Sequence, residues 1–313
     1  MIRSIKKLPS VAILMCTYNG ENFLKEQLDS IQNQDYKNWT LYVNDDGSKD
    51  ATLDILKAFQ KKWGNKKLII RRGPKKGFSQ NFLQIITDKK IQADLYFLSD
   101  QDDVWMPHKL SHTIKKLSKL DLLKPALYCA RTTYVSSDAQ KIIGESELFL
   151  KPPSFRNAIV QSLAGGNTMA FNNALKNFVS QNIEIEVISH DWWLYLVNEL
   201  IGGKTLYDAE STILYRQHSN SLIGANTGFI AKLRRLKMLL RGVYRNYNSL
   251  HLSVLNTINL PTTKAKLKLI NDFYINRDKG LFRRIRMIRK LGIYRQTLDT
   301  HLGLYLGAIF NKL

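Results

Sequence analysis

Short apolar runs alternate with helix-period segments through the first 220 residues of this 313-residue chain. The runs of strand length are Ser10–Cys16, Trp39–Val43, Leu68–Arg72 and Asp94–Leu98. The segments with apolar residues at helical spacing are Glu21–Asn33, Asp50–Trp63 and Ser79–Thr87, and Pro107–Leu120 is a further helix with proline near its first turn. Because parallel strands need long crossover connections, this alternation predicts an α/β fold with a mainly parallel sheet flanked by helices.

The composition is that of a globular chain with a real core, since 44% of the residues are hydrophobic and 23% are charged. Two cysteines are too few for a disulfide-stapled scaffold, and Cys16 and Cys129 both lie in apolar runs, so we expect them to be reduced core residues of a cytosolic protein. No run of 18 apolar residues occurs, and we expect neither a spanning helix nor a cleaved signal peptide.

Positive charge is concentrated in the last part of the chain. Residues 229–313 contain 18 Lys or Arg and three acidic residues, a balance of +15 out of +21 for the whole chain. Two basic amphipathic helices are predicted there, Phe229–Arg245 and Leu281–Leu291. We therefore predict two regions, a sheet-containing domain over 1–222 and a basic, helical C-terminal region over 223–313.

A polyanion is the partner that this charge predicts. The basic residues are interleaved with Leu and Ile at helical spacing, whereas a nucleic-acid surface typically presents base-stacking aromatics. The pattern favours the anionic surface of a membrane and no nucleic acid, with the protein lying on the inner face of the cell membrane. Plain surface helices around a small bundle, and a nucleic-acid-binding protein, remain the alternatives.

Polar and acidic residues follow three of the predicted strands. They are Thr17-Tyr18-Asn19-Gly20, Asn44-Asp45-Asp46-Gly47-Ser48 and Ser99-Asp100-Gln101-Asp102-Asp103. Because the carboxyl ends of parallel strands meet at one rim, the five acids would repel one another unless a cation lies between them. Oxygen ligands of this kind suit Mg²⁺ or Mn²⁺ together with a diphosphate. Alternatively, each segment is only a turn, a helix cap or a solvated strand end.

These three segments, in this order, resemble the nucleotide-sugar-binding half of inverting family 2 glycosyltransferases, which have the GT-A (Rossmann-like) fold. His190-Asp191-Trp192-Trp193 and Tyr215-Arg216-Gln217-His218 resemble stretches in bacterial members that build surface polysaccharides, including rhamnosyltransferases. The resemblance covers roughly residues 10–220. It implies a metal-dependent glycosyltransferase of the hexosyltransferase class.

The resemblance also implies a role for individual residues. It assigns the nucleotide to Thr17, Tyr18, Asn19, Asp46 and Asp100; the metal ion to Asp102 and His218; the acceptor and donor sugars to Gly166, Asn167, Trp192 and Trp193; the diphosphate to Lys76 and Arg216; and the role of catalytic base to Asp191. Lys75 is a further candidate for the diphosphate.

Several of these residues have simpler interpretations. Asp191 can serve as a helix N-cap, His190 as a hydrogen-bonded neighbour, and Lys75 with Lys76 as part of a solvated loop. Adjacent tryptophans diverge by about 100° on a helix, so at least one of the pair is expected in the core. For His218 a structural role and a ligand role are both open.

The implied reaction transfers a sugar from a nucleoside diphosphate to a hydroxyl of a lipid-linked or polysaccharide acceptor. The leading donor is dTDP-rhamnose, and UDP-hexoses, including galactose and glucose, are the alternatives. A catalytically silent scaffold that binds a sugar nucleotide is the alternative from another class of protein.

Overall fold

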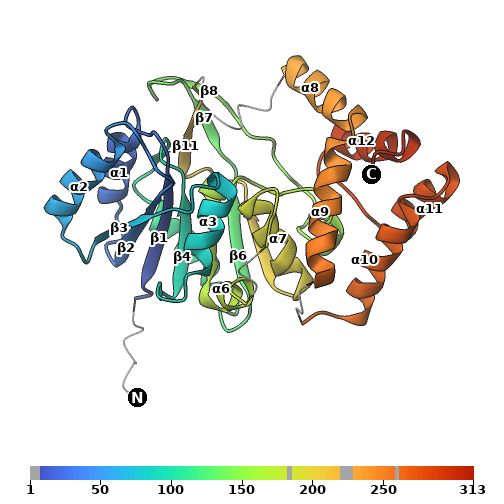
Figure 1. Cartoon of the computed structure of the whole chain (residues 1–313), viewed down its shortest axis with the longest axis horizontal. Helices are drawn as coiled ribbons and strands as arrows, with labels where there is room; N and C mark the ends of the chain where they lie inside the picture. Colours follow the sequence, from blue (N-terminus) through green and yellow to red (C-terminus); the bar gives the residue numbers. More distant parts are fainter. Residues whose placement is uncertain (1–7, 182–184, 219–227, 258–260) are drawn as a thin grey trace.

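The computed structural model describes residues 8–181, 185–218, 228–257 and 261–313, without the side chains of 228–232, 256 and 257. Its main sheet has seven strands in the order β10-β6-β9-β4-β1-β2-β3 (Figure 1). Their bounds are β1 Val11–Thr17, β2 Trp39–Asp45, β3 Leu68–Arg72, β4 Leu95–Ser99, β6 Ala126–Ala130, β9 Ala170–Asn172 and β10 Lys204–Asp208. All neighbours pair in parallel except β9, which runs antiparallel to β4 and β6. The predicted α/β class, with a mainly parallel sheet, is confirmed.

A second, four-stranded sheet lies beside the first, with the order β5-β11-β7-β8. Its strands are β5 Val104–Trp105, β7 Thr133–Val135, β8 Ile142–Glu145 and β11 Ile213–Arg216. The antiparallel pairing of β11 with β5 brings Arg216 next to the acidic segment that precedes β5. The periodicity of the sequence carried no sign of these short strands.

Helices cover both faces of the main sheet, and alternate residues of β1 supply the two cores. Val11, Ile13 and Met15 face one cluster, which contains residues of α1 Leu24–Gln32, α2 Thr52–Trp63 and α4 Lys109–Leu117. Ala12, Leu14 and Cys16 face the other cluster, formed with α3 Phe78–Thr87, α5 Phe155–Ala158, α6 Asn173–Val179 and α7 His190–Leu200. Cys16 and Cys129 are buried and unpaired, as predicted.

Among the residues that the structure describes, five helices form the C-terminal region, on the side of the molecule away from α1 and α2 (Figure 1). They are α8 Gly228–Leu240, α9 Val243–Thr257, α10 Lys264–Asn276, α11 Leu281–Leu291 and α12 Leu298–Ile309. The single helix predicted over Phe229–Arg245 is wrong, because Gly242 adopts a φ of +75° and separates α8 from α9. Within the described residues, no helix combines the length and apolar character needed to cross a bilayer.

The C-terminal helices share a core with the sheet domain. Leu252, Phe273 and Ile288 belong to the same buried cluster as Trp193 of α7 and Phe155 of α5. The predicted boundary at residue 222 falls within 219–227, outside the described residues. Beyond it, the chain returns to pack against α5 and α7 rather than forming a separate core.

Candidate active site

The ends of β1, β2 and β4 form one rim of the sheet. The strand register pairs Thr17 with Asp45 and Met15 with Ser99, so the segments that follow leave the sheet at the same edge. Between them, burial and then the charges of Asp100 and Asp46 raise the pKa of the Cys16 thiol well above its usual value. The carboxylates of Asp46, after β2, and of Asp100, after β4, therefore both raise the pKa of the same buried thiol. This agrees with the single rim that the sequence predicted.

Asp45 is used to shape the turn after β2. Its carboxylate accepts hydrogen bonds from the Thr17 hydroxyl at 2.9 Å, from the N–H groups of Gly47 and Ser48 at 3.1 and 2.9 Å, and from the Ser48 hydroxyl. Thr17 itself is 1% exposed. Both residues hold the rim together, so the expected direct contact of Thr17 with a nucleotide is not supported.

Asp46 organises the loop after β3. It accepts hydrogen bonds from the N–H groups of Lys75 at 2.6 Å and Gly77 at 3.0 Å. A Cβ on Gly73 would lie 2.7 Å from Asp46 Oδ1, so this close approach requires glycine. Lys76 lies between Lys75 and Gly77 in this loop and is exposed, and its contact with the diphosphate stays a prediction.

Gln101 ties the loop after β1 to the loop after β4. Its amide oxygen accepts from Tyr18 N–H at 2.9 Å, and its Nε2 donates to Tyr18 O at 3.0 Å. The Tyr18 side chain remains 55% exposed and available to a ligand. Asn19 contacts the loop after β2. Its backbone N–H donates to Ser48 Oγ, and its Oδ1 accepts from the Lys49 N–H, each at 2.9 Å.

Asp100, Asp102 and Asp103 bring their carboxylate oxygens within 4.8 Å of one another. Asp103 is fully buried and accepts from Asn167 Nδ2 at 2.8 Å and from Arg216 N–H at 3.3 Å. His218 Nε2 lies 3.0 Å from Asp102 Oδ2. Burial, then the charges of Asp102 and Asp191, raise the pKa of Asp100 to about 8. The crowding of these oxygens and the raised pKa of Asp100 fit a site for a hard divalent cation, whose charge would offset the repulsion.

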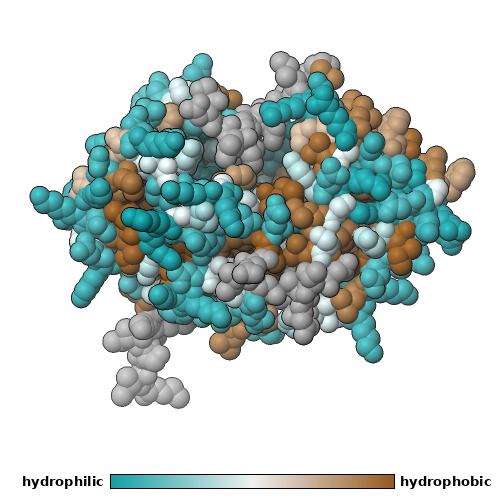
Figure 2. Space-filling model, viewed as in Figure 1, coloured by the Kyte–Doolittle hydropathy of each residue, from teal (hydrophilic) through white to brown (hydrophobic). Residues whose placement is uncertain are grey.

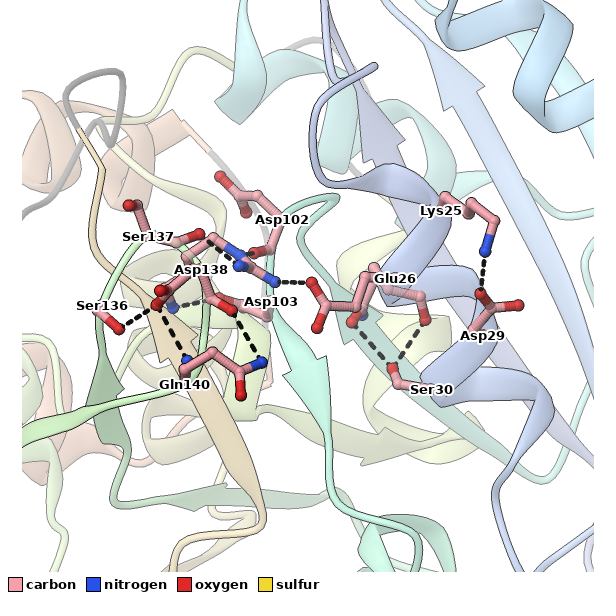
Figure 3. Close-up of polar contacts among 12 residues, drawn as sticks. Lys25, Glu26, Asp29, Ser30, Asp102, Asp103, Ser136, Ser137, Asp138 and Gln140 are labelled. Carbon is pink, nitrogen blue, oxygen red and sulfur yellow. Dashed lines mark hydrogen bonds and ion pairs between the residues drawn. The ribbon is translucent and has the colours of Figure 1, made fainter.

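Arg216 holds this acidic segment in place, and its partners Asp102, Ser137 and Glu26 are labelled in Figure 3. Its Nε donates to Asp102 O at 2.9 Å, its Nη1 donates to Ser137 O, and its Nη2 forms an ion pair with Glu26. The guanidinium also lies 4.8 Å from the centre of the Phe23 ring. The expected contact of Arg216 with the diphosphate is therefore wrong, because the side chain is 2% exposed and its donors point into the protein.

We expect Glu26→Ala to destabilise the fold by about 2 kcal/mol, because it leaves the buried Arg216 cation without its carboxylate partner. Urea unfolding followed by circular dichroism measures this change. Asp54→Ala, in the first turn of α2 with its side chain 82% exposed, is the matched control. Equal stability of the two variants would contradict the role given to Glu26.

Asp191 is the second residue of α7, and Ser189 rather than Asp191 occupies the N-cap position. Asp191 Oδ1 accepts from the N–H of Trp192 at 2.6 Å, and the side chain is 8% exposed. Its carboxylate therefore lies in the first turn of α7. After burial and the charge of Asp102, the charge of Asp191 also contributes to the raised pKa of Asp100, so these two carboxylates interact electrostatically.

Trp192 and Trp193 are both buried, at 7% and 1% exposure. Trp192 Nε1 donates to Ala158 O at 2.7 Å, which fixes the indole against α5. The prediction that these rings stack on a sugar is therefore wrong. The two side chains point in different directions because they are adjacent on α7. Both are nevertheless buried, in a core that the sheet domain and the C-terminal helices form together.

His190 stacks on Phe82, with ring centres 4.0 Å apart. Neither ring nitrogen has a hydrogen-bond partner among the described residues, so the interpretation of His190 as a hydrogen-bonded neighbour is wrong. A Cβ on Gly166 would lie 2.4 Å from His190 Nε2, so only glycine permits this approach. Gly166 and Asn167 are both buried. Gly166 packs against His190, and Asn167 donates a hydrogen bond to Asp103, so both residues support the rim from inside the protein.

Sequence reasoning missed Gln101 as a link between loops and Glu26 as the partner of Arg216. Gln101 had a weak signal, since it lies inside the acidic segment. Glu26 had none, because it lies 190 residues from Arg216.

Comparisons with known proteins agree with this geometry. The family model for glycosyl transferase family 2 matches residues 12–192. The dTDP-rhamnosyl transferase RfbG of Shigella flexneri is 28% identical over 275 residues, covering 85% of this chain and 88% of RfbG. The solved structure of S. aureus TarS with UDP-GlcNAc has a TM-score of 0.56 at 14% identity, covering 95% of this chain and 79% of TarS. Mannosyltransferase PcManGT from Pyrobaculum calidifontis, in complex with GDP-Man and Mn²⁺, has a TM-score of 0.50 at 14% identity, covering 97% and 87%.

The two solved structures support the GT-A fold for this chain, and the family model spans more than half of its length. Together with the acidic rim that the structure builds, these matches show that the chain is a glycosyltransferase and belongs to glycosyl transferase family 2.

Proposed function

We propose that this glycosyltransferase transfers rhamnose from dTDP-rhamnose to a hydroxyl group of a lipid-linked or polysaccharide acceptor. The observation that supports the proposal is the cluster of Asp100, Asp102 and Asp103, whose carboxylate oxygens lie within 4.8 Å of one another. The charge of Asp191 also contributes to the raised pKa of Asp100, which supports Asp191 as the candidate base. The choice of rhamnose rests on the similarity to RfbG over most of both chains.

The donor would lie along the rim, with its nucleotide against the exposed Tyr18 ring and near Asp46 and Asn19. Asp100 and Asp102 would hold Mg²⁺ or Mn²⁺, with His218 either as a further ligand or as the group that orients Asp102. The ion would supply positive charge against the diphosphate as negative charge accumulates there. Lys76 of the exposed loop would add to that charge.

Asp191 would take the proton of the acceptor hydroxyl as its oxygen attacks the anomeric carbon of the donor sugar. The bond between that carbon and the diphosphate oxygen breaks, and the bonding pair leaves with the nucleoside diphosphate. Because attack and departure occur on opposite faces of the carbon, the product has inverted anomeric configuration. The proton ends on Asp191 and then passes to solvent.

A donor screen tests this function. Purified protein is incubated with dTDP-rhamnose, UDP-glucose, UDP-galactose, UDP-GlcNAc or GDP-mannose, with Mg²⁺, Mn²⁺ or a chelator, and the released nucleoside diphosphate is measured. We expect the fastest release from dTDP-rhamnose. Preference for a UDP-hexose would support the alternative donor, and binding of a donor without any turnover would support the scaffold.

We also propose that α8 and α12 rest on the anionic inner face of the cell membrane. Exposed leucines and isoleucine form a stripe along each helix: Leu233, Leu236 and Leu240 on α8, and Leu298, Leu302, Leu306 and Ile309 on α12. Apolar and charged residues alternate over this side of the molecule (Figure 2). The α11 stripe expected from sequence contributes less, because Ile288 is buried in the core and only Phe282 of that stripe is strongly exposed.

We expect the protein to sediment with phosphatidylglycerol vesicles, and much less with phosphatidylcholine vesicles or at high salt. A triple Leu298→Ser, Leu302→Ser, Leu306→Ser variant should bind at least about tenfold more weakly, since each leucine contributes up to about 1.5 kcal/mol of burial. Leu123→Ser with Leu150→Ser, exposed outside the C-terminal region, is the matched control. Binding to oligonucleotides but not to vesicles would refute the membrane assignment.

A further inference from the structure

His251 of α9 is a buried polar side chain that lies beside the candidate base. It is 3% exposed, and neither of its ring nitrogens has a hydrogen-bond partner among the described residues. Its ring meets Trp192 edge-on, with centres 4.6 Å apart and an interplanar angle of 89°, and lies 6.2 Å from Trp193. Trp192 is the residue directly after Asp191, so α9 reaches the start of α7.

Asp191 and His251 are electrostatically linked. Burial lowers the pKa of His251 to about 4, and the charge of Asp191 opposes this shift. The imidazole is therefore neutral in ordinary buffers and offers one N–H donor and one acceptor nitrogen. Among the described residues, the one donor to the Asp191 carboxylate is the Trp192 N–H, so the carboxylate has room for a second.

Packing does not explain a histidine at this position. Burying two unpaired nitrogens is unfavourable for folding. An apolar side chain of similar size would fill the space against Trp192 and Trp193 without that cost. Buried polar groups of this kind are uncommon in native structures and concentrate at functional sites. His190, on the other side of Asp191, is already held by its stack on Phe82 and its close approach to Gly166.

We propose that His251 is a positioning residue for Asp191: in the substrate-loaded enzyme its imidazole N–H donates a hydrogen bond to the Asp191 carboxylate and fixes its orientation toward the acceptor hydroxyl. The inference rests on the proposed role of Asp191 as base. It makes the C-terminal helical region a part of the catalytic centre as well as a membrane-facing surface.

Substitution at residue 251 separates positioning from packing. We expect His251→Leu to lower kcat by about 10–100-fold, with donor affinity and KM for the acceptor little changed and Tm equal to or above that of the wild type. His251→Gln, which keeps an amide donor, should recover most of kcat. His108→Leu, an exposed histidine at the start of α4, is the control and should keep full activity.

Two results of these kinetic and stability measurements would overturn the proposal. One is wild-type kcat in His251→Leu; the other is an equal loss of kcat and Tm in both His251→Leu and His251→Gln, which would indicate a structural role only. A measurement without turnover is also available, because the chain has only six histidines. In protein labelled with ¹⁵N-histidine, Asp191→Asn should shift the ring resonances of His251, which are assigned by their loss in His251→Gln, whereas Asp54→Asn should not.

Unmoved His251 resonances in Asp191→Asn would refute this proposal whatever the enzyme transfers. Absence of turnover by the wild type with every donor would instead refute the proposed function. The two failures are therefore distinguishable.

Discussion

Asp191→Asn should reduce the rate of sugar transfer by about three orders of magnitude, within the range of 10²–10⁴ that a general base contributes. Asparagine keeps the size of the side chain and an oxygen that can accept from the Trp192 N–H, so α7 should begin as it does in the wild type. What is lost is the capacity to take the proton of the acceptor hydroxyl. Steady-state kinetics with saturating donor measures the effect on kcat.

The matched control is Asp54→Asn, since Asp54 is also an acidic residue in the first turn of a helix. It should retain wild-type kcat. Donor affinity, measured by calorimetry, should change little in Asp191→Asn. Wild-type transfer by this variant would remove Asp191 from the mechanism and leave the acidic cluster without its base.

Asp102→Asn should make nucleoside diphosphate binding insensitive to Mn²⁺ or Mg²⁺. In the wild type, the ion should strengthen binding because it joins the diphosphate to the crowded carboxylates of Asp100 and Asp102. Substitution of a residue that only hydrogen-bonds to a metal ligand typically lowers metal affinity about 10–100-fold. Loss of a ligand itself should lower it at least as much. Calorimetric titration with the nucleoside diphosphate, with the ion and with a chelator, gives both affinities.

Asp121→Asn, on an exposed loop after α4, controls for the change in net charge. It should keep the full effect of the ion. If the wild type binds the nucleoside diphosphate equally well with chelator and with Mn²⁺, the cluster does not bind a catalytic cation. Loss of the ion effect in both variants would indicate a nonspecific influence of charge.

The elements that the sequence predicted correctly are those with a local signal. Leu68–Arg72 and Leu281–Leu291 were predicted to the residue, because an apolar run or a helical stripe ends there at a clear change of pattern. The rim was predictable for a related reason, since parallel strands place all their carboxyl ends at one edge. That rule needs no knowledge of which side chains meet.

The roles of individual side chains were less predictable, because partner choice depends on contacts distant in sequence. Arg216 looked free to bind phosphate until Glu26, 190 residues away, was seen to hold it. One tryptophan of the pair was expected in the core, but the burial of both could not be predicted, because nothing in the sequence places α9 over α7. The Phe229–Arg245 helix was predicted without a break because Gly242 is tolerable in a helical pattern, and only its positive φ shows that the chain turns there.

The shared core of α5, α7 and the C-terminal helices affects how the chain is assembled during synthesis. Ser154 Oγ lies 2.8 Å from Tyr294 Oη, and Asn157 donates to Tyr294 O, contacts that span 140 and 137 residues. Until the ribosome has released α11, the apolar sides of α5 and α7 have no cover from that part of the chain. Nascent protein in that interval should be a good substrate for chaperones that hold exposed apolar segments, and slow translation between α7 and α11 should favour aggregation.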